Sequence, residues 1–286
     1  MIAIISIYFF IIIGFVAKKI FNELNEKSFV IISVYFLQPF LTLWGLTLKP
    51  IDFNSFFAPL LYLEVIFISL IFTFLLSKLL PKKDRSIATI TALIGNTGNL
   101  GIPLSFAIFG SDGAFWATLL NLTNMFFIYS FGIFFYAGKF NLQNAKKIFK
   151  IPILYVGIIA LIINYLQINL SFISQMLKMG AYSSMVIQLI IFGIYTANIK
   201  IKKIPIKLSF IITFEKFILI PIIGYILLSF FDINETIKKI IILEVSVPIA
   251  VNNVNLAALF DNQPEIVAWL IILSSILFIP YFVFIF

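Results

Sequence analysis

The chain has 286 residues, of which 62% are hydrophobic and 11% are charged, whereas a soluble domain has about 45–50% apolar and about 25% charged residues. The mean hydropathy of +1.13 excludes a soluble enzyme and an intrinsically disordered chain. The sequence contains no Cys and no His, which excludes disulfides, thiolate nucleophiles, histidine triads and the usual zinc sites. We therefore expect neither a metal nor a cofactor.

The net charge of +8 does not indicate nucleic-acid binding, because the lysines fall in short segments between apolar runs. Such placement is typical of the loops that set membrane topology. At the N-terminus, Lys18 and Lys19 follow an apolar run rather than precede it. A cleaved signal peptide has the opposite order, so we interpret this run as a retained first span.

Ten apolar segments have roughly the 20 residues that a helix needs to cross a bilayer. They are 2–20, 28–48, 57–79, 86–109, 113–137, 151–169, 173–197, 208–230, 236–260 and 265–286. Their apolar runs are continuous rather than alternating, which favours helices over strands. The sequence therefore predicts an all-α integral membrane protein with ten transmembrane helices.

The basic residues are distributed unevenly between alternate loops. Fifteen lie in the first, third, fifth and seventh loops or at their edges, and four lie on the opposite side. Cytoplasmic loops carry the excess of Lys and Arg, so we expect both termini outside. A composition rich in Ile, Phe, Lys and Asn suggests an AT-rich bacterial genome, and hence a multi-pass protein of a bacterial inner (cytoplasmic) membrane.

The longest loop lies near the middle of the chain, on the predicted cytoplasmic side. Residues 139–150 form this loop, which separates a first group of five segments (1–138) from a second group (151–286). An odd number of spans in each half gives the halves opposite orientations, as in many secondary transporters. The sequence thus predicts two inverted five-helix repeats.

The fourth and ninth segments differ from the others because each holds a proline and a cluster of asparagines. The fourth contains Pro103 and the run Asn-Thr-Gly-Asn-Leu-Gly at 96–101, and the ninth contains Pro248 and Asn-Asn-Val-Asn-Leu-Ala at 252–257. Proline removes a helical hydrogen bond, and asparagine is costly in lipid unless it faces protein or water. We expect both helices to be interrupted.

Paired interruptions at matching positions are the best sequence indication of a transport site, because free helix ends attract anions. The candidate substrate-binding residues are Asn96, Thr97, Gly98, Asn99, Pro103, Pro248, Asn252, Asn253 and Asn255. The alternative is that these small and polar residues only permit close helix packing.

Few ionisable side chains fall inside the predicted spans, and each is a functional candidate. Glu244 precedes Pro248 by one helical turn and is the first candidate for proton coupling. Glu64 and Glu215 occupy the eighth positions of the third and eighth segments and are further candidates. Their alternative role is structural. Lys216 is expected to snorkel or to pack against another helix.

Segments 95–110, 247–260 and 15–43 resemble the corresponding spans of the auxin efflux carrier family, whose bacterial members include malonate and malate permeases. The resemblance implies ten helices in two inverted repeats, with the interrupted fourth and ninth helices crossing at mid-membrane. It further implies a scaffold of spans one, two, six and seven, a mobile transport domain, and a homodimer through spans two and seven.

Sodium–bile-acid symporters and sodium–proton antiporters are similar in architecture, so the fold alone does not give the substrate. The antiporters carry adjacent acidic residues in their core, and this sequence has no adjacent Asp or Glu pair. Arg85 is the only arginine and lies outside the predicted spans, so a carboxylate would have to be bound by backbone N–H groups and Asn amides rather than by a guanidinium.

These observations predict a permease that moves a small organic anion, such as a carboxylate, across the inner membrane by alternating access. The alternatives are a sodium- or proton-coupled symporter or antiporter of the same architecture, a channel, and an intramembrane enzyme. The enzyme is disfavoured because no Asp lies deep in a span. The expected partners are the anion, the lipid bilayer and a second copy of the chain, without nucleic acid.

Overall fold

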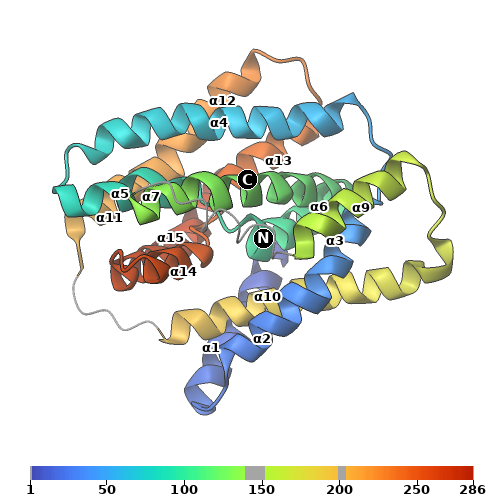
Figure 1. Ribbon diagram of the computed structural model, residues 1–286, viewed down its shortest axis with the longest axis horizontal. Helices are drawn as coiled ribbons and strands as arrows, with labels where there is room; N and C mark the ends of the chain where they lie inside the picture. The colour runs from blue at the N-terminus through green and yellow to red at the C-terminus, as the bar shows by residue number, and fades with distance from the viewer. Residues whose placement is uncertain (1, 139–151, 199–203, 286) are drawn as a thin grey trace. The chain divides into compact units, whose positions relative to one another are not determined.

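A computed structural model describes residues 2–138, 152–198 and 204–285 of the chain (Figure 1). Across these residues the regular secondary structure is helical, with one isolated antiparallel bridge between Gly95 and Ile249. The expectation of an all-α protein is confirmed. The predicted cytoplasmic loop 139–150 lies outside the described residues.

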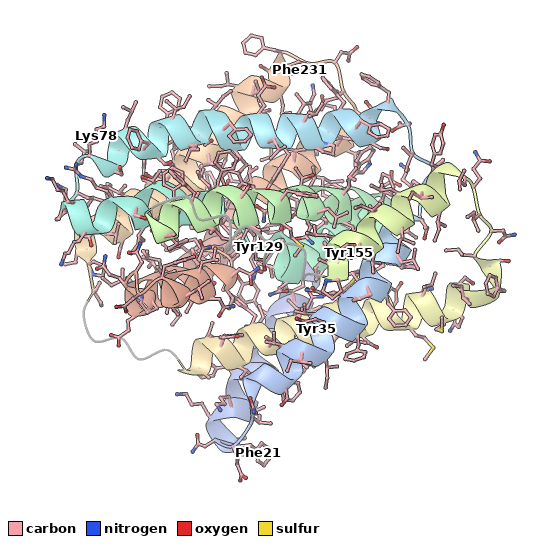
Figure 2. The ribbon with its side chains drawn as sticks, in the orientation of Figure 1. Phe21, Tyr35, Lys78, Tyr129, Tyr155 and Phe231 are labelled. Carbon is pink, nitrogen blue, oxygen red and sulfur yellow. The ribbon has the colours of Figure 1, made fainter. Side chains whose placement is uncertain are left out.

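Six helical stretches are long and apolar enough to cross a membrane within the part of the chain that is described. They are Ser28–Leu46, Phe53–Ser77, Thr97–Ala137, Ser171–Ala197, Ile206–Ser229 and Pro264–Ile285. Many large apolar side chains on these and other helices are exposed, as expected for a surface in contact with lipid. Figure 2 shows two aromatic examples, Phe21 beyond the end of α1 (Ile2–Ile20) and Tyr155 on α9 (Pro152–Tyr165).

The contacts divide the chain into two compact units. Unit 1 comprises residues 1–57, 98–122 and 147–198, and unit 2 comprises residues 58–97, 123–146 and 199–286. Each unit takes residues from both halves of the sequence. The units therefore differ from the predicted repeats 1–138 and 151–286, whose inverted relationship stays a prediction.

Unit 1 contains the helices that correspond to the first, second, sixth and seventh predicted segments. They are α1, α2 (Glu26–Ile32), η1 (Ser33–Leu37), α3 (Gln38–Leu46), α9, η6 (Ser171–Ile173) and α10 (Ser174–Asn198). Helix α1 packs across α10 (Figure 1). A Cβ at Gly14 would lie 2.0 Å from the carbonyl oxygen of Ile190, and one at Gly193 would lie 1.9 Å from that of Ile11. The two backbones thus touch where only glycine fits.

A polar cluster joins three chain segments at one end of unit 1. The Asn164 amide nitrogen donates to the carbonyl oxygens of Leu46 and Lys49, both at 2.5 Å, and its oxygen accepts from the N–H of Ile51 at 3.0 Å. Lys49 also forms an ion pair with Asp112 at 2.8 Å. Lys49, Ile51 and Asp112 lie in loops that were predicted outside, and Leu46 and Asn164 lie near the outer ends of predicted spans. The contacts therefore agree with placing these segments on one side of a membrane.

Helix α6 (Ile102–Phe127) contains a break that the sequence anticipated. Gly110 has a φ of +62° inside α6, a conformation that glycine adopts without steric cost. The predicted fourth and fifth segments were separated between residues 109 and 113, so the change of direction lies where we expected it.

Unit 2 contains the other helices, together with the end of α6 and most of α4 (Phe53–Ser77). These are α5 (Lys82–Ile90), η2 (Thr91–Leu93), η4 (Ile128–Gly132), α7 (Ile133–Ala137), α11 (Ile206–Phe214), η7 (Glu215–Leu219), α12 (Ile220–Ser229), α13 (Glu235–Ser246), α14 (Asn252–Leu259) and α15 (Pro264–Ile285). Helices α5 and α7 lie side by side (Figure 1). Local signals set several ends: the Asn234 side chain caps α13 by accepting from the N–H of Thr236, and Pro264 opens α15.

Basic side chains hold helix ends in both units. In unit 2, Arg85 donates to the carbonyl oxygen of Leu80 and Lys207 donates to that of Leu79. In unit 1, Lys19 donates to the carbonyl oxygen of Ala197. Cations are favourable at such C-terminal carbonyls. The contacts of Lys207 and Lys19 bring together segments from different loops that were predicted to be cytoplasmic, whereas the Arg85 contact lies within one loop.

Candidate functional site

The central feature of unit 2 is a crossing of two non-helical segments inside apolar surroundings. The chain leaves the helical conformation at 94–96 and again at 247–251. The N–H of Asn96 donates to the carbonyl oxygen of Pro248 at 2.8 Å, and the N–H of Ala250 donates to that of Ile94 at 3.0 Å. Both expected interruptions are present, and they satisfy each other's backbone groups.

The two prolines contribute differently. Pro248 lies within its interruption, as expected from its missing N–H. Pro103 is the second residue of α6 and follows the π-helical turn η3 (Thr97–Gly101) directly, so it lies inside a continuous helical stretch. The first interruption thus occurs several residues before Pro103, at Gly95, which forms the bridge with Ile249.

A buried chain of hydroxyl and amide groups supports the crossing from one side. The Asn253 amide nitrogen donates to the carbonyl oxygens of Ile94 and Ala250, each at 3.1 Å. Its oxygen accepts from the Tyr136 hydroxyl at 2.9 Å, and that hydroxyl lies 2.8 Å from the hydroxyl of Thr91. Asn253 is fully buried, and its side chain is thus used by the protein itself.

Two further side chains hold the crossing segments. The Asn124 amide nitrogen donates to the carbonyl oxygen of Gly95 at 3.1 Å and to the Thr97 hydroxyl at 2.9 Å. The Ser274 hydroxyl accepts from the N–H of Ile249 at 3.2 Å. The irregular backbone is therefore satisfied by buried side chains, as it must be at membrane depth.

A buried lysine lies against the crossing. Lys216 is 1% exposed, and its ammonium donates to the carbonyl oxygen of Ala92 at 3.1 Å. A Cβ at Gly95 would lie 3.1 Å from this ammonium nitrogen. Of the two expectations for Lys216, snorkelling and packing against another helix, the structure shows the second, because the side chain points into unit 2 and contacts the end of η2. It belongs to η7, a π-helical turn of a kind frequent at functional sites.

The proton-coupling candidates lie in different environments. Glu244 is fully buried on α13 and interacts electrostatically with the Lys216 ammonium and the Tyr62 hydroxyl. Glu215 is also fully buried, and neither of its carboxyl oxygens has a hydrogen-bond partner among the described residues. Glu64 is exposed on α4. The matched positions of Glu64 and Glu215 in the sequence therefore do not correspond to matched burial.

The structure brings some of the substrate-binding candidates together in unit 2. Asn96 is buried, and its amide nitrogen has no hydrogen-bond partner in the described residues. Pro248 and Thr97 are buried beside it in the crossing, whereas on α14 Asn252 is half-buried and Asn255 is exposed. The Asn96 amide nitrogen is thus a buried donor that the described residues leave without a partner.

The remaining candidates belong to unit 1. Gly98 and Asn99 are half-buried, and Pro103 is buried. A Cβ at Gly98 would lie 3.0 Å from the amide oxygen of Asn121, so this glycine permits close approach of that side chain. Close packing, the alternative weighed from the sequence, thus applies at Gly98.

Sequence reasoning missed four residues that hold the crossing: Asn124, Tyr136, Thr91 and Ser274. None lies in a recognisable motif, although a polar residue such as Asn124 within a predicted span is a usable signal. Lys216 was noted for its charge, but its position next to Ala92 depends on tertiary packing.

Comparisons with known proteins agree with this architecture. A family model described as membrane transport protein matches residues 1–286. The chain is also 26% identical over 283 residues to an uncharacterized transporter from Methanocaldococcus jannaschii, a match that covers 93% of this chain and 91% of the relative. The family match confirms the resemblance to auxin efflux carriers, and the chain belongs to the membrane transport protein family.

Proposed function

We propose that the chain is a secondary transporter that moves a small organic anion across the bacterial inner membrane by alternating access. The observation that carries the proposal is the crossing in unit 2, where irregular backbone and asparagine side chains lie between apolar helices. Non-helical backbone at membrane depth is tolerated where it is buried or lines a cavity, and transporters place substrate sites at such broken helices.

The chemistry of the crossing favours an anion such as a carboxylate. The Asn96 amide nitrogen is a buried donor without a partner among the described residues, and α14 begins at Asn252, where helix N–H groups favour negative charge. The other candidates, Thr97, Gly98, Asn99, Pro103, Pro248, Asn253 and Asn255, shape or support the site in this proposal. Asn253 contributes indirectly, because its amide nitrogen binds the carbonyl oxygens of Ile94 and Ala250 and so stabilises the crossing segments.

The proposed arrangement has ten spans in two inverted five-helix repeats, with both termini outside. The helices of the first, second, sixth and seventh segments form the scaffold, and their presence in one compact unit supports this assignment. The transport domain contains the crossing and moves against the scaffold. The protein is proposed to form a homodimer through the second and seventh spans.

The membrane potential provides a sufficient driving force for an anion, because one charge is worth about 2.3 kcal/mol per 100 mV. A proton-coupled mechanism is the second candidate. It is favoured by the buried carboxyl group of Glu244 at the crossing, with Glu215 and Glu64 as further proton carriers.

Uptake of radiolabelled malonate into liposomes containing the purified protein tests the proposal. We expect saturable uptake that unlabelled dicarboxylates compete with and that an imposed membrane potential drives. Liposomes with Asn96→Leu should take up less, and those with Tyr225→Phe, a change at an exposed residue of α12, should match the wild type. Single-channel currents, or the absence of uptake for every mono- and dicarboxylate tried, would contradict the proposal.

A further inference from the structure

The Lys216 ammonium occupies a position that is lined by carbonyl oxygens. It donates to the carbonyl oxygen of Ala92 at 3.1 Å. A Cβ at Gly95 would lie 3.1 Å from the ammonium nitrogen and 3.3 Å from the carbonyl oxygen of Glu244. The ammonium therefore contacts the Ala92 carbonyl group and lies on the same side of Gly95 as the Glu244 carbonyl group.

The crossing itself deprives both carbonyl groups of their helical donors. In a continuous helix the carbonyl oxygen of Ala92 would accept from the N–H of Asn96, but that N–H donates to Pro248. The carbonyl oxygen of Glu244 would accept from residue 248, which is a proline without an N–H. The ends of η2 and α13 thus place partial negative charge at this position.

The nearby side chains also favour a cation here. The Glu244 carboxyl group interacts electrostatically with the Lys216 ammonium, and both residues are fully buried. Carbonyl and carboxylate oxygens are the ligands that hard cations prefer, and broken helices of transporters bind coupling cations through such helix ends. A free sodium ion at the ammonium position would have the Ala92 carbonyl oxygen as a ligand and the Glu244 oxygens as the nearby candidates to complete its coordination.

We infer that Lys216 is a tethered cation, which fills the cation position of the crossing and makes the protein independent of bound sodium. The lysine is covalently attached, so its amine stays with the crossing through every conformation. The inference assigns to Lys216 a positioning role: it stabilises the crossing that presents Asn96. It rests on the proposed function only where substrate is concerned, and it argues against sodium coupling.

Thermal unfolding of the purified protein in detergent tests the cation position without substrate. Wild type, Lys216→Ala and Lys216→Gln are compared in sodium chloride, potassium chloride, methylammonium chloride and choline chloride at equal ionic strength. We expect the wild type to melt at the same temperature in sodium and choline salts. Both variants should melt lower in choline chloride and be stabilised, with saturation, by sodium or methylammonium.

The Gln variant removes the charge and keeps an N–H donor on a side chain one atom shorter, so it keeps the test valid if the Ala variant does not fold. Lys239→Ala removes an exposed lysine of α13 and should behave as the wild type in every salt. Stabilisation of the wild type by sodium over choline would overturn the inference. So would a Gln variant that melts as the wild type does in choline, or that no small cation stabilises.

Malonate uptake in choline buffer, measured on the same preparations, separates this inference from the proposed function. Wild-type uptake without sodium, together with variant uptake restored by sodium, supports both. A lack of uptake in the wild type counts against the proposed function, whereas the melting temperatures still decide the role of Lys216.

Discussion

The Tyr136 hydroxyl donates to the side-chain oxygen of Asn253 at 2.9 Å, and through it α7 is joined to the start of α14. The same asparagine donates to the carbonyl oxygens of Ile94 and Ala250 on the two crossing segments. One side chain therefore holds both segments and is itself held by Tyr136. Asn253 and Tyr136 therefore build the crossing, and in the proposed function other residues bind the substrate.

Tyr136→Phe should destabilise the protein. The change leaves the Asn253 side-chain oxygen without its donor in a fully buried position, which costs about 1–3 kcal/mol. We expect a lower melting temperature in detergent, while Tyr225→Phe, at a tyrosine that is 74% exposed, changes it little. Equal melting temperatures for Tyr136→Phe and the wild type would show that this hydrogen bond does not stabilise the crossing.

Asn253→Leu should lower the stability of the protein, whereas Asn96→Leu should lower its affinity for malonate. Asn253→Leu removes the donor to two backbone carbonyls, so the melting temperature should fall. Asn96→Leu removes an amide nitrogen that has no hydrogen-bond partner among the described residues, so stability should be kept. Malonate affinity should then fall by about 1.5–3 kcal/mol, the range for a hydrogen bond to a charged group, which is roughly tenfold or more.

Both quantities are to be measured on the same preparations, by thermal unfolding and by equilibrium binding of malonate. Unchanged affinity in a stable Asn96→Leu protein would remove this residue from the site. The proposal would then rest on the positive end of the α14 dipole, because the N–H groups of Asn253 and Val254 already donate to Ala250 and Val251.

The sequence predicted the interruptions because their causes are local. Pro248 lacks an N–H wherever the chain places it, and the Asn clusters are costly in lipid. The contacts that complete the site are not local: Lys216 meets Ala92, and Tyr136 meets Asn253, through helix packing that no short motif encodes. The burial of individual side chains could not be predicted for the same reason. Glu64 and Glu215 occupy matching positions in the sequence, but only Glu215 is buried.

Gly14→Ala and Gly193→Ala should each weaken unit 1. The added Cβ would lie 2.0 Å or 1.9 Å from a carbonyl oxygen of the facing helix, so α1 and α10 would have to separate. Overpacking of this kind costs about 1–3 kcal/mol, and a lower melting temperature is expected for both variants. Val16→Ala, at an exposed position of α1, is the matched control, and a control that destabilises as much would refute the explanation.

A C-terminal reporter that is active only in the cytoplasm should stay inactive, since we expect both termini outside. The physical reason is the excess of Lys and Arg in the predicted cytoplasmic loops. The contacts of Lys207 with Leu79 and of Lys19 with Ala197 agree with grouping those loops on one side. A reporter that is active only after export to the periplasm should be active at the same position. An active cytoplasmic reporter would contradict the predicted topology and indicate the opposite orientation.

The crossing in unit 2 is made by main-chain atoms, through the N–H groups of Asn96 and Ala250 and the carbonyl groups of Pro248 and Ile94. Main-chain hydrogen bonds do not depend on which side chain a residue carries, except where proline removes the donor. In the proposed transporter, substitutions at positions 96 and 252 would therefore change the cargo without removing the main-chain hydrogen bonds that form the crossing.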